Sequence, residues 1–189
     1  MNDRNRSIKK KIKKILDNER YQHTLGVAYT AASLAMRYRL DPEDLFTAGL
    51  LHDCAKNIPN DEKYSLCKKY KIELNEVEKK APYLLHSKLG AYLAEKDFGI
   101  KDKEILNAIR YHTTGRPDMS LTEKIIFVAD YIELNRSEAP NLKEIREMAF
   151  TDIDEAVKKV LTDTLDYLSK GDRPVDPTTK ETYDFYAKS

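Results

Sequence analysis

The stretch AGLLHDCAK, residues 48–56, places an imidazole and a carboxylate, His52 and Asp53, directly behind two leucines. Leucines favour burial, whereas an unpaired buried carboxylate is so costly that such a group is normally paired or binds a metal. The stretch therefore predicts a helix that carries two polar side chains into the interior. Their partner has to lie in the interior as well.

The size and composition of the whole chain are typical of one globular domain. Of its 189 residues 41% are hydrophobic and 34% charged, and we expect a single domain over residues 1–189. The net charge of +1 gives no global field that would attract nucleic acid. No apolar run approaches the roughly 18 residues of a membrane span. Two cysteines without paired spacing favour a reduced, cytoplasmic protein.

Helical periodicity predominates along the chain, and alternating strand patterns are rare. Glycine and proline are few and lie where helices are expected to join, as in DPED at 41–44 and TTGRPDMSLTEK at 113–124. The expected helices span residues 7–18, 20–38, 42–54, 60–69, 75–80, 86–97, 102–112, 121–134, 141–149 and 152–169. Residues 170–189 are expected to be irregular, with at most a short final helix. These patterns predict an all-α domain.

All four histidines fall on apolar faces of expected helices. They are His23, His52, His86 and His112. Asp130, in KIIFVADYIEL, likewise shares a face with Ile126 and Phe127. A single inward histidine is usually a core residue with a hydrogen-bond partner, but together with Asp53 and Asp130 the four are most simply explained by a metal. Imidazole and carboxylate ligands suit zinc, iron, manganese or nickel, and facing helices can hold such sites.

Five segments together resemble a known family. They are ERYQHTLGVAYTAASLA, AGLLHDCAK, LLHSKLGAYLA, AIRYHTTGRPDMSLTEKIIFVADYIELNR and the tail VDPTTKETYDFY. The order of His23, His52–Asp53 and Asp130 resembles the HD-domain metal-dependent phosphohydrolases. Nearly the whole chain resembles the YqeK-type symmetrical bis(5′-nucleosyl)-tetraphosphatases. The resemblance implies an HD-domain helical bundle with a metal site in its core, which splits diadenosine tetraphosphate into two ADP.

The same resemblance implies the metal ligands. The main ligands would be His23, His52, Asp53 and Asp130. His86 and His112 match two further histidines, which either hold a second metal bridged through the aspartate or contact substrate phosphate in a one-metal enzyme. We expect two metals rather than one, and iron as the metal, with manganese as an alternative.

Cations near these ligands in sequence are candidates for binding phosphate. Asp53 is expected to bridge the metals or orient a metal-generated hydroxide, and Lys56 to act beside it in catalysis and on phosphate. Arg20 lies one helical turn before His23, and Arg136 follows Asp130; a guanidinium suits phosphate oxygens. The other residues expected to bind substrate are His86, His112, Thr113, Gly115, Arg116, Asp176 and Thr179.

Three other functions are compatible with the same ligand pattern. The chain could be another HD-domain hydrolase that acts on a nucleoside monophosphate or a guanosine alarmone, a di-iron oxygenase, or a non-catalytic nucleotide sensor. A sensor is disfavoured, because binding alone does not require a hydroxide generator. The expected partners are the nucleotide substrate and the ADP product, with no nucleic acid and no membrane. The resemblance also implies that a homodimer could form.

Overall fold

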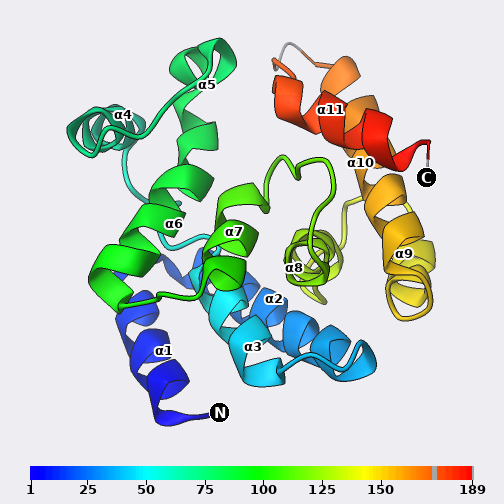
Figure 1. Ribbon diagram of the computed structural model, residues 1–189, viewed down its shortest axis with the longest axis horizontal. Coiled ribbons are helices and arrows are strands. Elements are labelled where there is room, and N and C mark those ends of the chain that lie inside the picture. Colours follow the sequence, from blue (N-terminus) through cyan, green and yellow to red (C-terminus); the bar gives the residue numbers. More distant parts are fainter. Residues whose placement is uncertain (172–173, 189) are drawn as a thin grey trace.

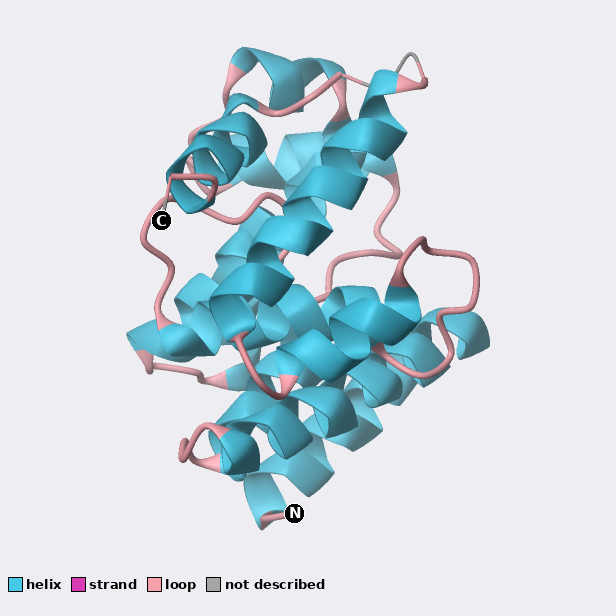
Figure 2. Cartoon of the chain, turned by 90° about the vertical axis from the view of Figure 1, so that its right-hand side faces the viewer, coloured by secondary structure: helices cyan, strands magenta, loops and turns pink. Residues whose placement is uncertain are grey.

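The structure, a computed structural model, describes residues 1–171 and 174–188, and these residues form helices and no strand (Figure 2). The helices are α1 (Asp3–Ile15), α2 (Asn18–Arg37), α3 (Pro42–Leu51), α4 (Asn60–Lys69), α5 (Glu76–Lys80), the 3-10 helix η1 (Pro82–Leu84), α6 (Leu85–Phe98), α7 (Lys103–Tyr111), α8 (Leu121–Ile132), α9 (Leu142–Ala149), α10 (Ile153–Ser169) and α11 (Pro177–Tyr186). The expected all-α fold is confirmed. No described helix is both long enough and apolar enough to cross a bilayer.

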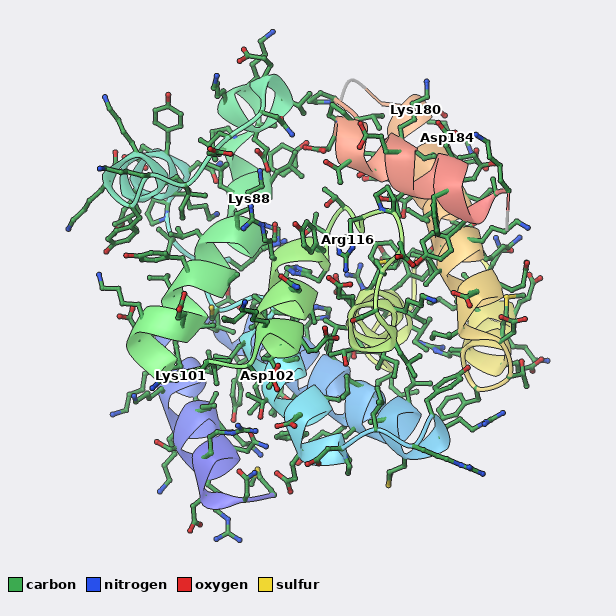
Figure 3. The ribbon with its side chains drawn as sticks, in the orientation of Figure 1. Lys88, Lys101, Asp102, Arg116, Lys180 and Asp184 are labelled. Atoms are coloured by element: carbon green, nitrogen blue, oxygen red, sulfur yellow. The ribbon has the colours of Figure 1, made fainter. Side chains whose placement is uncertain are left out.

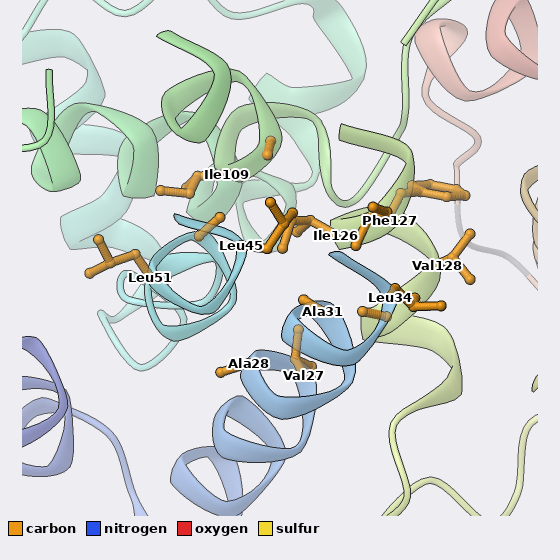
Figure 4. Packing of buried hydrophobic residues seen from close by; sticks show 14 of the residues in the cluster. Val27, Ala28, Ala31, Leu34, Leu45, Leu51, Ile109, Ile126, Phe127 and Val128 are labelled. Atoms are coloured by element: carbon orange, nitrogen blue, oxygen red, sulfur yellow. The ribbon is translucent and has the colours of Figure 1, made fainter. Parts of the chain in front are cut away.

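The main core forms where α2, α3, α7 and α8 meet (Figure 4). Its buried side chains include Val27, Leu34, Leu45, Leu51, Ile109, Ile126 and Phe127. The axes of α2 and α3 approach closely because residue 49 is glycine. A Cβ atom at Gly49 would lie 2.6 Å from the Cα atom of Ala28. These four helices therefore form a closely packed frame beside which the expected site residues lie.

Helix α1 packs on α3 and α2, and most of the other helices flank this frame on two sides. Figure 1 shows α4, α5 and α6 on one side of α7, and α9, α10 and α11 on the side of α8. A smaller core of Ala55, Cys67, Leu85 and Leu89 joins α4 to α6 and to the segment that follows α3. As a result, the segment after α3 and the start of α6 are held next to each other, and α7 packs directly on α6.

Capping side chains determine where α2 and α8, two of the helices that carry expected ligands, begin. Asp17 accepts a hydrogen bond from the backbone N–H of Arg20 at the start of α2, at 2.8 Å. Ser120 and Glu123 form a reciprocal capping box at the start of α8. Such caps satisfy the free N–H groups of a first helical turn. They therefore set the register of the α2 and α8 faces that turn toward the core.

The predicted start of the first helix is wrong, and the tail is more helical than expected, with the short final helix that was allowed for there. α1 begins at Asp3 instead of residue 7, because the Asn2 side chain caps it by accepting from the Asn5 backbone N–H. The tail, expected to be mostly irregular, contains the ten-residue helix α11, which packs on α10. Residues 172, 173 and 189 of that expected tail lie outside the described residues.

Two predicted helix ends near the centre are also wrong. α3 ends at residue 51 and α7 at residue 111, so His52 and His112 cap these helices and do not lie within them. Each imidazole turns back to a carbonyl of its own last turn: His52 Nδ1 lies 2.7 Å from Gly49 O, and His112 Nδ1 lies 2.8 Å from Ile109 O. The side chain thereby satisfies a carbonyl that the ending helix leaves free.

Candidate metal centre

The six expected ligands converge beside the main core. They are His23, His52, Asp53, His86, His112 and Asp130. They come from α2, the turn after α3, α6, the end of α7, and α8. All are buried except Asp130, whose side chain is 21% exposed. The centre is therefore enclosed, and its Asp130 side is the one that meets solvent.

Each histidine ring is oriented through its Nδ1 atom. In His52, His86 and His112 this atom lies 2.7–2.8 Å from the carbonyl oxygen three residues earlier. In His23 it lies 3.1 Å from Oε1 of Glu133. These oxygens accept, so Nδ1 donates to them and Nε2 is the ring nitrogen that faces the centre. All four Nε2 atoms are therefore the nitrogens through which the rings can ligate a metal.

Asp53 directs its two oxygens toward two sets of imidazoles. Oδ2 lies 3.5 Å from Nε2 of His52 and 4.0 Å from Nε2 of His23. Oδ1 lies 3.2 Å from Nε2 of His86 and 3.5 Å from Nε2 of His112. A carboxylate in this position can bridge two cations, each shared with one set of histidines.

Two groups of ligand atoms could each hold a cation, with the atoms of each group within 4.8 Å of one another. The first is His23, His52 and Asp130; the second is His52, Asp53 and His112. His23 Nε2 approaches Asp130 Oδ1 to 3.0 Å without hydrogen-bond alignment. His23 Nε2, His52 Nε2 and Asp53 Oδ1 are buried and have no hydrogen-bond partner among the residues that the structure describes. Such atoms are costly to bury, so the donor set fits a divalent cation.

The electrostatics keep the donors in their ligand forms. Burial acts to raise the pKa of Asp53, but His52 and the other imidazoles outweigh it and hold that pKa well below its usual value. Burial likewise acts to raise the pKa of Asp130, and His23 and His52 outweigh it there. Burial, with a nearby lysine, lowers the pKa of His86 to about 4. Near neutral pH both aspartates are therefore ionised and His86 is neutral.

Three of the expected phosphate-binding cations surround the two carboxylates. Arg20 Nη1 lies 2.9 Å from Asp53 Oδ2, and Lys56 Nζ lies 3.7 Å from Asp53 Oδ1. Arg136 donates to Asp130 Oδ1 at 3.0 Å. All three side chains are partly exposed, so they connect the carboxylates with the solvent. A cationic rim of this kind suits phosphate oxygens.

Thr113 lies at the same centre. Its hydroxyl is 3.2 Å from Nε2 of His86 and 3.2 Å from Nε2 of His112. Lys56 Nζ is 3.1 Å from Nε2 of His86. The Nε2 atoms of His86 and His112 therefore have protein donors nearby, whereas no described residue donates to Nε2 of His23 or of His52.

Gly115 and Arg116 follow Thr113 but have structural partners. Arg116 forms a two-pronged ion pair with Glu123 at 2.9 and 2.7 Å, in the middle of the molecule in Figure 3. Gly115 has a φ of +64°, and a Cβ atom there would lie 2.7 Å from Thr182 Cγ2 of α11. Glycine is thus required both for the turn and for the approach of α11. The substrate-binding role of the two residues stays a prediction.

Asp176 and Thr179 belong to the start of α11. Asp176 caps this helix and also accepts from Asn75 Nδ2 at 2.8 Å, which ties α11 to the start of α5. Thr179 is buried in the first turn of α11. Their expected contact with the nucleoside likewise stays a prediction.

Glu133 is a residue of the centre that sequence reasoning missed. It lies just past the end of α8 and is 1% exposed, with Oε1 on His23 Nδ1. Its signal in the sequence is an acid three residues after Asp130, at the end of an apolar run. Because Leu134 and Asn135 after it are exposed, that position looks like an ordinary surface turn.

An all-α bundle with these imidazoles and carboxylates beside its core defines the class of HD-domain proteins, and the HD domain family model matches residues 20–135. The chain is 41% identical over 174 residues to the symmetrical bis(5′-nucleosyl)-tetraphosphatase of Bacillus subtilis (strain 168), covering 92% of both chains. It is 42% identical over 172 residues to the protein of the same name from Halalkalibacterium halodurans, covering 91% of both. The chain belongs to this family of symmetrical bis(5′-nucleosyl)-tetraphosphatases within the HD-domain proteins.

A solved structure of an HD superfamily hydrolase has the same fold. The crystal structure of a predicted HD superfamily hydrolase involved in NAD metabolism from Clostridium acetobutylicum superimposes with a TM-score of 0.93. The two sequences are 38% identical, and the match covers 97% of this chain and 96% of the other.

Proposed function

We propose that this protein hydrolyses diadenosine tetraphosphate symmetrically, giving two ADP. The observation that carries the proposal is the convergence of four imidazole acceptors and two ionised aspartates inside a rim of three cations. The names of the relatives in Bacillus subtilis and Halalkalibacterium halodurans support the same substrate and the same symmetrical cleavage.

The residues that would hold the metal are His23, His52, Asp53 and Asp130, with His86 and His112 completing a second position. We propose iron, with manganese as the alternative, because imidazole and carboxylate together suit both. A bound cation of this kind lowers the pKa of water and stabilises charge on phosphoryl oxygens. The partnerless Nε2 atoms and the Asp53 oxygen support a cation at this place.

The other side chains of the site would orient water, bind phosphate or contact the nucleoside. Asp53 orients the attacking water, and Arg20, Lys56 and Arg136 bind the phosphate oxygens on which negative charge accumulates. The P–O bond between the central bridging oxygen and one inner phosphorus breaks, water adds to that phosphorus, and both products leave as ADP. In a one-metal enzyme His86 and His112 would contact phosphate directly. The proposed nucleoside contacts are Thr113, Gly115, Arg116, Asp176 and Thr179.

Product analysis tests the proposal. The purified protein is supplied anaerobically with iron or manganese and then with diadenosine tetraphosphate, and the nucleotides are separated. ADP as the only product, absent with Asp53→Ala, is the expected result. ATP plus AMP would contradict symmetrical cleavage, and a metal-loaded protein that forms no product would contradict the substrate.

We further propose that the chain works as one domain over residues 1–189 in the cytoplasm, with the nucleotide and ADP as its ligands and with no nucleic-acid partner. A homodimer is the proposed assembly. Light scattering after size-exclusion chromatography measures the assembly, and limited proteolysis that yields no stable fragment would support the single domain.

A further inference from the structure

We propose that Glu133 is a positioning residue for His23, and that it makes the pocket of His23, His52 and Asp130 bind a divalent cation more tightly than the pocket of His52, Asp53 and His112. The inference rests on the proposed metal site. It adds the order in which the two pockets bind cations. It attributes that order to Glu133, which is not itself an expected ligand.

Both oxygens of Glu133 are committed to defined partners. Oε1 lies 3.1 Å from His23 Nδ1. Oε2 accepts from the backbone N–H of Asn135 at 2.8 Å and from its side-chain amide at 3.0 Å. With Oε2 clamped by two donors, the carboxylate is held with Oε1 aimed at the imidazole, which fixes the Nδ1–H tautomer of His23.

The fold makes space for this buried acid at Gly26. A Cβ atom on residue 26 would overlap Oε2 of Glu133, and it would lie 3.2 Å from the side-chain nitrogen of Asn135. Gly26 lies three residues after His23, on the next turn of the same α2 face. The glycine therefore permits the contact between Glu133 and His23.

The charge of Glu133 lacks an ordinary counter-ion. Among residues 1–171 and 174–188, no lysine or arginine lies within ion-pair distance of its carboxylate, and His23 is its one ionisable contact. Arg146, the nearby cation, donates to the backbone carbonyl of Glu133 instead. A buried carboxylate without a counter-ion is costly. A cation bound at Nε2 of His23 would balance the negative charge of Glu133 from the other side of the imidazole ring.

Among the described residues, a carboxylate lies behind a histidine in the pocket of His23, His52 and Asp130 but not in the pocket of His52, Asp53 and His112. His23 is the single histidine of the four with a carboxylate behind it, whereas His52, His86 and His112 donate to neutral carbonyls. A carboxylate partner raises the basicity of a ligating imidazole, and losing such a partner typically costs 10–100-fold in metal affinity. Among the described residues, His23 Nε2 is also a buried atom without a hydrogen-bond partner, and it belongs to this pocket alone.

Titration of the metal-free full chain with Co²⁺, followed by visible absorption, tests the inference without using activity. We expect two steps in the wild type, the tighter one lost in His23→Ala and the weaker one lost in His112→Ala. Glu133→Gln keeps the shape and one acceptor but removes the charge. It should weaken the tighter step about tenfold or more and leave the weaker step unchanged.

The matched control is Glu138→Gln, an exposed acid in the same segment, which should change neither step. Gly26→Ala displaces the same carboxylate from the opposite side and should also weaken only the tighter step; circular dichroism verifies that each variant is folded. A tighter step unchanged in Glu133→Gln, or equal weakening of both steps, would overturn the inference. Failure of the wild type to bind Co²⁺ would instead contradict the proposed metal site.

Discussion

The Nε2 atoms of His86 and His112 lie 3.2 Å apart, and both rings donate their Nδ1–H to a backbone carbonyl. His86 is neutral near pH 7, so its Nε2 lone pair faces the second ring and is satisfied only by a donor or a cation. Lys56 and Thr113 come within 3.1 and 3.2 Å of these nitrogens. The pair is built to meet positive charge, either from these donors or from a metal.

We expect that charge to be a second metal, which His86→Ala tests. Removing one of its ligands should reduce bound metal from about two equivalents to about one, and turnover should fall with it. Elemental analysis of the purified variant measures the stoichiometry. Unchanged metal content with a raised KM would instead assign His86 to substrate phosphate.

Asp53→Asn should abolish most of the activity, because Asp53 directs one oxygen to each set of histidines. A metal's stabilisation of phosphoryl charge is worth several kcal/mol, and each 1.36 kcal/mol is tenfold, so the loss in kcat should be on the order of 10³-fold. Steady-state kinetics and metal analysis of the same preparation check this. Near-normal turnover would contradict the site.

Arg136→Ala should weaken substrate binding and leave the bound metal in place. Its guanidinium donates to Asp130 at the solvent-facing side, where a phosphate would arrive. Losing a charge-assisted hydrogen bond costs about 1.5–3 kcal/mol, so KM should rise about tenfold or more. Arg110→Ala, an exposed arginine on α7, is the control. Loss of metal in Arg136→Ala would show that the arginine serves the ligands and not the substrate.

Two buried glycines should respond differently to alanine. In Gly49→Ala the new Cβ would lie 2.6 Å from backbone of α2, which should destabilise the protein by about 1–3 kcal/mol. In Gly90→Ala the nearest atom is Cys54 Sγ at 3.5 Å, an ordinary contact. That change should be neutral or slightly stabilising because alanine favours a helix. Urea unfolding compares the two, and equal effects would contradict the close approach of α2 and α3.

Asp17 should contribute stability that depends on pH. Hydrogen bonds from the Arg20 backbone and the Asn57 side chain lower the pKa of Asp17 below its ordinary value of 3.8. The ionised form therefore stabilises the folded protein above about pH 4, and this contribution is lost as the pH falls through the folded-state pKa. Asp17→Asn should lower Tm at pH 7.

The difference in Tm between Asp17→Asn and the wild type should shrink as the pH is lowered below about 4. The wild-type carboxylate then becomes protonated and is uncharged, as asparagine is at every pH. Glu95→Gln, at an exposed position of α6, should show no such pattern. A difference in Tm that is the same at pH 3 and pH 7 would mean that the charge of Asp17 contributes nothing.

The histidines show which features of the site can be predicted from the sequence and which cannot. Helical period and apolar neighbours suffice to predict that His23, His52, His86 and His112 face inward, because burial of one helix face is a local property of the pattern. The same pattern placed His52 and His112 within helices, whereas each helix ends at the residue before its histidine. Helix ends depend on which group satisfies the last carbonyls, and here that group is the imidazole itself.

Helical periodicity and motif resemblance suffice to predict an all-α chain, six inward imidazole and carboxylate side chains, and the family of the protein. Tertiary contacts, which no local pattern specifies, direct the Asp53 oxygens to two pairs of histidines, pair Arg116 with Glu123 and bring Glu133 to His23. Residues 23 and 133 are 110 positions apart, and their contact exists because α2 packs against α8 with Gly26 between them. Such pairings arise from helix packing, which periodicity within one segment cannot encode.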